Sequence, residues 1–312
     1  MTVVRGGARR IFPARMAGLN SRTILVRTTL LAIAIGAVVP AMTSVARAES
    51  GTATSSRPAR DEAVRAIPWR QMTPEARRTA QFVIKNASIY RRLPTRVIDC
   101  DPDLFNFLLQ HPEVVIDVWR IMGISQVALE KLPDGAYRGT DGAGTIGLVR
   151  FLYSHWGPNA DNVAVVFADG CYEGKPFVSR LKAQSIMLLR SSAVQETNGR
   201  HYITVRVDTF VRIDQAGVEL VAKTVQPWIS KTADRNLIET LSFVSNFSRT
   251  AEKNPQGMQR LATRLATLDE PTRNELVALC FRTAERYAGA PAAYGNAALL
   301  AQRHEAAVRH SR

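Results

Sequence analysis

The sequence has few cysteines and lacks the motif of any familiar metal site. Its 312 residues contain only three cysteines, Cys100, Cys171 and Cys280, and the five histidines occur singly. Neither a CxxC pair nor the His/Cys spacing of a zinc site is present, so we predict no metal site and no cofactor. We expect the cysteines to be buried as small apolar residues, although an oxidising compartment would allow one disulfide among them. The spacing of the three cysteines does not indicate which two would form that disulfide.

Signatures of catalysis are also missing. A GxSxG motif is absent, which argues against serine-hydrolase chemistry. The segment DGAGT at 141–145 lacks the lysine and the following helix of a phosphate-binding loop. Asp99 and Asp101 flank Cys100, but acidic residues that precede a helix usually cap it. We therefore predict no catalytic residue, and an enzyme is the last of the function classes that we consider.

Acidic residues are absent from the first 48 residues, which hold seven arginines. An apolar stretch at 30–42 is followed by the small-residue pattern Ala46-Arg47-Ala48. This layout predicts a secretory signal peptide cleaved near Ala48, and hence a periplasmic or secreted protein. Because the apolar stretch of about 13 residues is short for a bilayer span, no transmembrane helix is expected in the mature chain. An uncleaved membrane anchor is the alternative.

A strong positive charge is missing once this N-terminal segment is removed. The formal net charge of +14 falls to about +7 without its seven arginines. The remaining basic residues are scattered along the chain instead of gathering in one run, so a nucleic-acid partner is not expected.

The remaining chain divides by composition and periodicity into five parts. A small, polar, proline-bearing linker precedes an N-terminal helical segment, in which Thr73 suits the N-cap and Pro74 the first helical position. An α+β domain follows, then a helical hairpin and an alanine-rich tail of low complexity. The expected bounds are 49–62 for the linker, 63–93 for the helical segment, 94–254 for the α+β domain, 255–288 for the hairpin and 289–312 for the tail.

The α+β domain begins with a short strand at 97–100 and two short helices that end at Gly123. From 127 to 226 the period changes to two, and short turns such as LPDG, TNGR and DQAG join the segments. This pattern predicts a curved sheet of about six to seven antiparallel strands. In the clearest strand, from Tyr202 to Ile213, apolar residues alternate with polar ones, so we expect one buried face and one solvated face.

The polar face of this strand carries Arg206, Asp208 and Arg212. We interpret these residues as solvated surface, with a polar anchor for a ligand as the alternative.

A long helix is predicted from Thr232 to Asn254. Its apolar residues cover more than about 200° of the circumference, against about 100° for an ordinary surface helix. A helix of this kind must be buried on three sides. We expect Thr232 to cap the helix, and we expect the helix to pack across the concave face of the sheet. The alternative is that neighbouring C-terminal helices cover the additional side.

The element order over roughly 94–254 is a strand, two short helices, about six antiparallel strands and one long helix. This order resembles that of START-like proteins, the helix-grip superfamily of lipid-transfer and polyketide-cyclase-like domains. That resemblance implies a C-terminal helix that closes a cavity for a lipid or another apolar molecule. The segments DCDPDLFNFLLQHPEVVIDVWRIMG, DGAGT and VAKTVQPWISKTADRN are also similar to those of an exported bacterial family, which implies no particular function.

Three functional hypotheses follow. The first is an exported, non-catalytic binding module that holds an apolar small molecule or lipid between the sheet and the long helix. The second is a structural or interaction protein whose core is filled by its own side chains and whose basic C-terminal helices dock a protein partner. The third is a cyclase-like or hydrolase-like enzyme that uses the same cavity. Ligand identity and oligomeric state stay open. The predicted cavity-lining residues are Trp119, Tyr153, Leu237, Leu241, Phe243, Val244 and Phe247.

Overall fold

The computed structural model describes residues 51–174, 180–214 and 226–289. The expected signal peptide therefore lies outside the described residues. So do residues 215–225, near the end of the region expected to form strands, and all but the first residue of the expected tail.

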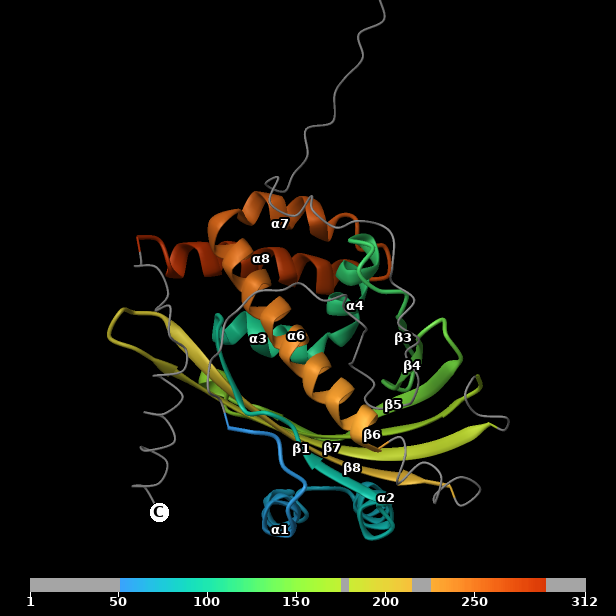
Figure 1. Ribbon diagram of the computed structural model, residues 1–312. Helices are drawn as coiled ribbons and strands as arrows, with labels where there is room; N and C mark the ends of the chain where they lie inside the picture. Colours follow the sequence, from blue (N-terminus) through green and yellow to red (C-terminus); the bar gives the residue numbers. More distant parts are fainter. Residues whose placement is uncertain (1–50, 175–179, 215–225, 290–312) are drawn as a thin grey trace, which may run out of the picture.

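The chain has the predicted α+β class and is built on one antiparallel sheet (Figure 1). The strands follow in the spatial order β1-β8-β7-β6-β5-β4-β3, and β2 pairs with the same edge of β8 as β1 does. Every neighbouring pair is antiparallel, as the short turns predict. The strands are β1 (Ile89–Arg92), β2 (Arg96–Asp99), β3 (Ala128–Lys131), β4 (Tyr137–Thr140), β5 (Thr145–Trp156), β6 (Asn162–Tyr172), β7 (Leu181–Gln195) and β8 (His201–Ile213).

Several of the described helices begin after a residue whose side chain caps them. The Thr73 hydroxyl accepts from the backbone N–H of Ala76, and Asp101 accepts from Asp103 and Leu104, as expected for N-caps. The described helices are α1 (Arg57–Ala66), α2 (Pro74–Lys85), α3 (Pro102–Gln110), α4 (Pro112–Ile121), α6 (Gln226–Lys253), α7 (Pro255–Ala262) and α8 (Glu270–Arg286), with a short 3-10 turn at Pro158–Ala160.

Two predicted boundaries near the N-terminus are wrong. Residues 57–62 belong to α1 and not to a linker, because Ser56 caps the helix and a proline is tolerated in its first turn. Residues 89–92 form strand β1 instead of continuing a helical segment. Their partner is β8, more than a hundred residues later in the chain, where the Ser88 N–H donates to Val211 at 2.9 Å.

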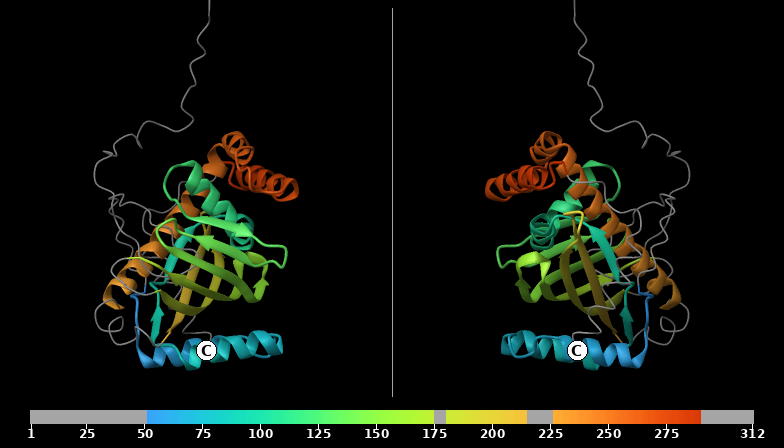
Figure 2. Two further views of the ribbon diagram at one scale, coloured as in Figure 1. Left: turned by 90° about the vertical axis from the view of Figure 1, so that its right-hand side faces the viewer. Right: turned by 90° about the vertical axis from the view of Figure 1, so that its left-hand side faces the viewer.

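The inner face of the sheet, defined here as the face that carries Ile203, Val205 and Val207, is covered by helices. These side chains share one hydrophobic cluster with α3, α4, α6, α7 and α8. Figures 1 and 2 show α3 and α4 above this face, with α7 and α8 farther from the sheet. The helices α3 and α4 contribute many of these buried side chains. The predicted packing of the long helix α6 across the concave face is not confirmed.

The wide apolar arc of α6 has neighbours on more than one side. Its backbone approaches the sheet most closely at β2, while α7 and α8 pack against its C-terminal part. The C-terminal helices α7 and α8 therefore cover the additional apolar side of α6, which is the alternative given in the sequence analysis. The predicted start is wrong, since α6 begins at Gln226 and Thr232 lies inside it. A proline in the second position of a helix is compatible with its first turn, so Pro227 does not delay the start.

The outer face of the sheet, which carries Asp208 and Phe210, is not solvated as predicted. Both residues are fully buried, and α1 and α2 lie against this face (Figure 1). A second hydrophobic cluster joins these helices to Phe210 and to Ile186 and Leu188 of β7. The predicted alternation of β8 is correct. The polar face of β8 is nevertheless buried, because α1 and α2 of the N-terminal segment cover it.

An ion-pair network fixes α1 to this face. Asp208 accepts from the Tyr90 hydroxyl and from Arg92 Nε, each at 2.7 Å, and from Arg190 Nη2 at 2.9 Å. Glu62 of α1 accepts from Arg190 Nη1 at 2.8 Å and also pairs with Arg92. The network therefore links α1, β1, β7 and β8. Asp208 is a structural counter-ion in this position and not a solvated surface residue.

Glu62 gives this network a measurable pH dependence. Burial acts to raise the pKa of Glu62, but the hydrogen bonds and charges of Arg190 and Arg92 outweigh it and lower the pKa from 4.5 to about 2. A carboxyl with a lowered folded-state pKa stabilises the protein above its unfolded pKa, and this stabilisation is lost as the pH falls through the folded value. We expect Glu62→Gln to cost about 1–2 kcal/mol at neutral pH, less than the full shift because Glu62 is part-exposed.

Urea unfolding between pH 7 and pH 2 measures this effect. The difference in unfolding free energy between wild type and Glu62→Gln should narrow between about pH 4.5 and pH 2. Glu130→Gln is the matched control, because Glu130 forms an exposed pair with Arg138. A constant difference over the whole range would contradict the assigned role of Glu62.

Candidate ligand-binding site

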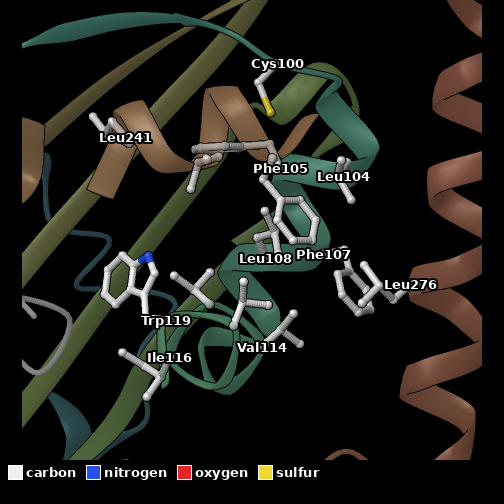
Figure 3. Close-up of a cluster of buried hydrophobic side chains, with 14 of the residues drawn as sticks. Cys100, Leu104, Phe105, Phe107, Leu108, Val114, Ile116, Trp119, Leu241 and Leu276 are labelled. Atoms are coloured by element: carbon white, nitrogen blue, oxygen red, sulfur yellow. The ribbon is translucent and has the colours of Figure 1, made fainter. Parts of the chain in front are cut away.

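An aromatic cluster joins α4 to α6 on the inner side of the sheet. Trp119 of α4 is completely buried, and its ring lies edge-on to Phe243 of α6 with centroids 5.4 Å apart. The ring of Phe243 in turn lies next to the ring of Phe247, with centroids 5.9 Å apart. Figure 3 shows Trp119 on the side of α4 that faces Leu241 of α6, away from Leu276 of α8. The edge-on contact of Trp119 with Phe243 is a favourable geometry for aromatic rings.

The Trp119 indole has an unsatisfied donor. Its Nε1 is buried and has no hydrogen-bond partner among the described residues. A buried N–H without an acceptor costs about 1–3 kcal/mol, and most such groups in proteins have a protein or water partner. One acceptor atom at this position would satisfy the indole N–H.

The structure brings together six of the seven predicted lining residues. Trp119, Leu241, Val244 and Phe247 are buried in the inner cluster, while Leu237 and Phe243 are half-buried at its margin. Those on α6 therefore form one stripe along the helix, as their spacing predicts.

Tyr153 is the residue that the structure separates from the others. It packs against the outer cluster with α1 and α2, on the opposite side of the sheet from Trp119. The cause is an irregularity in β5 between Phe151 and Tyr153, where the register with β6 shifts. Simple alternation places both aromatic rings on one face, but a bulge moves the following residue to the other face.

Polar groups that sequence reasoning missed lie along the same interior. Thr209 of β8 and Thr240 of α6 each have a buried hydroxyl with no hydrogen-bond partner among the described residues. Thr209 follows Val205 and Val207 in the inward-facing row of β8. The sequence therefore indicated this position only by one hydroxyl-bearing residue in a row of aliphatic residues. Thr240 lies one turn before Phe243 on the buried stripe of α6.

An ion pair joins α6 to β1. Asp234 accepts from Arg91 Nε of β1 at 2.8 Å. Arg96 of β2 has an electrostatic interaction with Asp234. Burial lowers the pKa of Arg96, and Asp234 partly opposes that effect. Asp234 and Phe243 are nine residues apart, which places them about 180° apart around α6, so the ion pair and the aromatic cluster lie on different sides of the helix.

The acidic residues around Cys100 form structural contacts. Asp99 accepts from Arg200 Nε at 3.1 Å, and Asp101 caps α3 while it pairs with Arg286. Burial raises the pKa of the Cys100 thiol, which disfavours the nucleophilic thiolate. Capping was therefore the correct interpretation of Asp101, and this cluster does not resemble a catalytic site.

Two carboxylates of α4, those of Glu113 and Asp117, lie on a different side of this helix from Trp119. Glu113 accepts from His111 Nδ1 at 3.1 Å when that nitrogen is protonated, and Asp117 is buried one turn later. These two carboxylates lie at least about 120° around the helix from Trp119. They do not share the interior along α6, so this pair adds no acid-base chemistry to the candidate site.

All three cysteines are buried, unpaired thiols. The described residues include no group of three or more His, Cys, Asp or Glu side chains that could hold a metal ion. In the same part of the chain, the helices are all too short or too polar to cross a membrane.

Comparisons with known proteins add little. No protein-family model matches the chain, and no curated protein matches it either. One solved structure with a similar arrangement is a crystal structure of hypothetical protein jhp0584 from Helicobacter pylori. The likeness has a TM-score of 0.33 and 7% sequence identity, and it covers 49% of this chain and 87% of that chain. A likeness this distant carries no functional conclusion.

Proposed function

We propose that this protein is an exported, non-catalytic binding module that holds an apolar small molecule or lipid between α6, α4 and the inner face of the sheet, in a helix-grip-like arrangement. The observation that carries the proposal is the buried, unpaired indole N–H of Trp119 beside the half-buried ring of Phe243. A site with mainly apolar walls and a few polar groups is typical of small-molecule binding. Export is proposed from the N-terminal sequence pattern.

The interaction-protein alternative has less support. It predicts an exposed apolar surface on residues 258–281, but Met258, Leu265, Leu276 and Leu279 are all buried. In the described part of the chain, the exposed large apolar side chains are elsewhere. They are Phe82, Met122, Ile146 and Leu148.

Native mass spectrometry of the exported form, purified from its own host, tests the proposal. The expected result is a co-purifying apolar adduct that is released on denaturation. A clean apo mass, together with no thermal shift across a panel of lipids, would overturn the proposal.

A substitution at Phe243 tests the location of the site. Phe243→Ala is expected to weaken binding of a simple apolar probe, dodecanol, by about tenfold or more, because the ring supplies part of the apolar contact. Isothermal titration of the delipidated protein measures the change. Tyr153→Ala is the matched control, because Tyr153 is also a half-buried aromatic residue but lies on the outer side of the sheet. Equal losses in both variants would place the site elsewhere.

A further inference from the structure

Two like charges lie side by side on the outer face of the sheet, on the opposite side from the candidate ligand site. Arg190 of β7 and Arg206 of β8 are directly opposite each other in the pairing of these strands, so their side chains are neighbours on that face. Both residues are half-buried. Like charges at directly opposite positions destabilise a sheet. This pair therefore needs negative charge close to it.

The carboxylates nearby compensate only two of the three guanidinium groups. Glu62 and Asp208 both form ion pairs with Arg92 and with Arg190. Among the described residues, Arg206 has neither a hydrogen bond nor an ion pair. These five side chains, which we call the outer arginine cluster, hold three guanidinium groups against two carboxylates. The surplus positive charge is that of Arg206.

Unused hydrogen-bond donors accompany this surplus charge. Arg190 Nε is buried and has no partner in the described part of the chain, although both Nη groups of Arg190 donate to carboxylates. Arg206 lies two residues before Asp208 on the same face of β8, about 7 Å along the strand. Its five N–H groups are therefore free to donate to a molecule that is not part of the described chain.

The electrostatics of the cluster agree with this geometry. Burial lowers the pKa of Arg206, and the positive charges of Arg190 and Arg92 lower it further. Glu62 and Asp208 act in the opposite direction, but each has a smaller effect than either arginine. The surroundings of Arg206 are therefore net repulsive for its own charge, and an added anion would reverse this.

A tetrahedral oxyanion matches the available donors better than a carboxylate does. The planar guanidinium fork binds two oxygen atoms of a carboxylate or a phosphate at once. A carboxylate has only two oxygens, which one fork occupies. Phosphate or sulfate has further oxygens, so it can accept from Arg206 and from Arg190 Nε together. Because the position is half-buried, salt screens this attraction less than at an exposed site.

We propose that Arg206 and Arg190 Nε form a binding site for a phosphate or sulfate group on the outer face of the sheet, where α1 and α2 lie (Figure 1). The bound oxyanion supplies the missing negative charge and lies between the two guanidinium groups. This site is separate from the candidate site on the inner face, and the inference does not depend on the proposed function.

Four probes test the chemical class of the ligand. Isothermal titration of the mature protein uses inorganic phosphate, sulfate, acetate and dihexanoylphosphatidic acid, with the ionic strength held constant by sodium chloride. We expect phosphate and sulfate to bind about tenfold or more tighter than acetate, because only they reach both arginines. If phosphatidic acid binds tighter than inorganic phosphate, the natural ligand is a lipid headgroup; equal or weaker binding indicates a free anion.

Two variants with opposite expected effects test the residues. Arg206→Gln should weaken phosphate binding by about tenfold or more, because the surplus cation is lost. Glu62→Gln should strengthen phosphate binding, because a competing carboxylate is removed; damage to the fold would not produce a gain. Arg138→Gln is the control, since it removes one positive charge from an exposed pair with Glu130. Circular dichroism confirms that each variant is folded.

Three results would overturn the inference. The first is that wild type binds neither phosphate nor sulfate under these conditions, or binds acetate equally well. The second is phosphate binding that is unchanged in Arg206→Gln. The third is an equal loss in Arg206→Gln and Arg138→Gln, which would indicate a general effect of net charge. The apolar-ligand function would stand in each case, because Phe243→Ala and dodecanol test it at the other face.

Discussion

Replacing Asp208 with alanine is expected to lower the free energy of unfolding by about 3–5 kcal/mol, the usual cost of removing one partner from a buried ion pair. Asp208 is 0% exposed and is the shared acceptor of Arg92, Arg190 and Tyr90. Without it, two guanidinium groups remain in a partly buried position with Glu62 as their carboxylate partner. The expected loss is large because a buried cation cannot recover its hydration.

Urea unfolding followed by circular dichroism measures this loss. Asp208→Asn should cost less than Asp208→Ala, because the amide oxygen still accepts a hydrogen bond. Glu130→Ala is the matched control at an exposed pair and should change the unfolding free energy by less than about 1 kcal/mol. If Asp208→Ala were no more destabilising than Glu130→Ala, the network on the outer face would contribute nothing to stability.

Replacing Arg200 with alanine is the second change with a large expected effect. The side chain of Arg200 is only 5% exposed, and it donates to Asp99 at 3.1 Å and to Glu252 at 2.7 Å. Its guanidinium also lies 5.0 Å from the ring centre of Tyr287. The residue therefore connects β2, the start of β8, α6 and the end of α8. We expect a loss of about 3–5 kcal/mol, because Asp99 and Glu252 lose their common cation.

The same cluster supplies an internal control. Arg249 also donates to Asp99, at 3.3 Å, but its side chain is 45% exposed. We expect Arg249→Ala to cost less than about 1 kcal/mol, since solvent screens an exposed pair. Thermal and urea unfolding of both variants give the comparison. Similar losses for Arg200→Ala and Arg249→Ala would show that burial does not determine the strength of these pairs.

Local signals predicted the elements that depend on local chemistry. The N-cap at Thr73 and the cap at Asp101 are contacts between residues two or three positions apart, so the sequence pattern contains both partners. The antiparallel order of β5 to β8 likewise follows from short turns. The start of α6 was missed because Thr232 suits an N-cap, whereas the helix begins at Gln226 and a proline at its second position is compatible with the first turn.

The candidate site was predictable only in part. The α6 residues from Leu237 to Phe247 follow from helical spacing, and Trp119 follows from the apolar character of α4. Tyr153 was assigned to the wrong side because an irregularity in β5 reverses the alternation after Phe151. The contact of Arg91 with Asp234 was missed because β1 reaches this place only by pairing with β8, which no local pattern encodes.

Taken by itself, the sequence determined the α+β class, the antiparallel strands and the apolar stripe of the long helix. These properties depend on the period of side chains along one element. Only the tertiary structure decided that α1 and α2 bury the polar face of β8, and that Asp208 becomes a buried counter-ion. It also decided that Arg91 of β1 pairs with Asp234 of α6. The physical reason is that burial and ion pairing depend on which distant segments come into contact, and a one-dimensional pattern does not record those contacts.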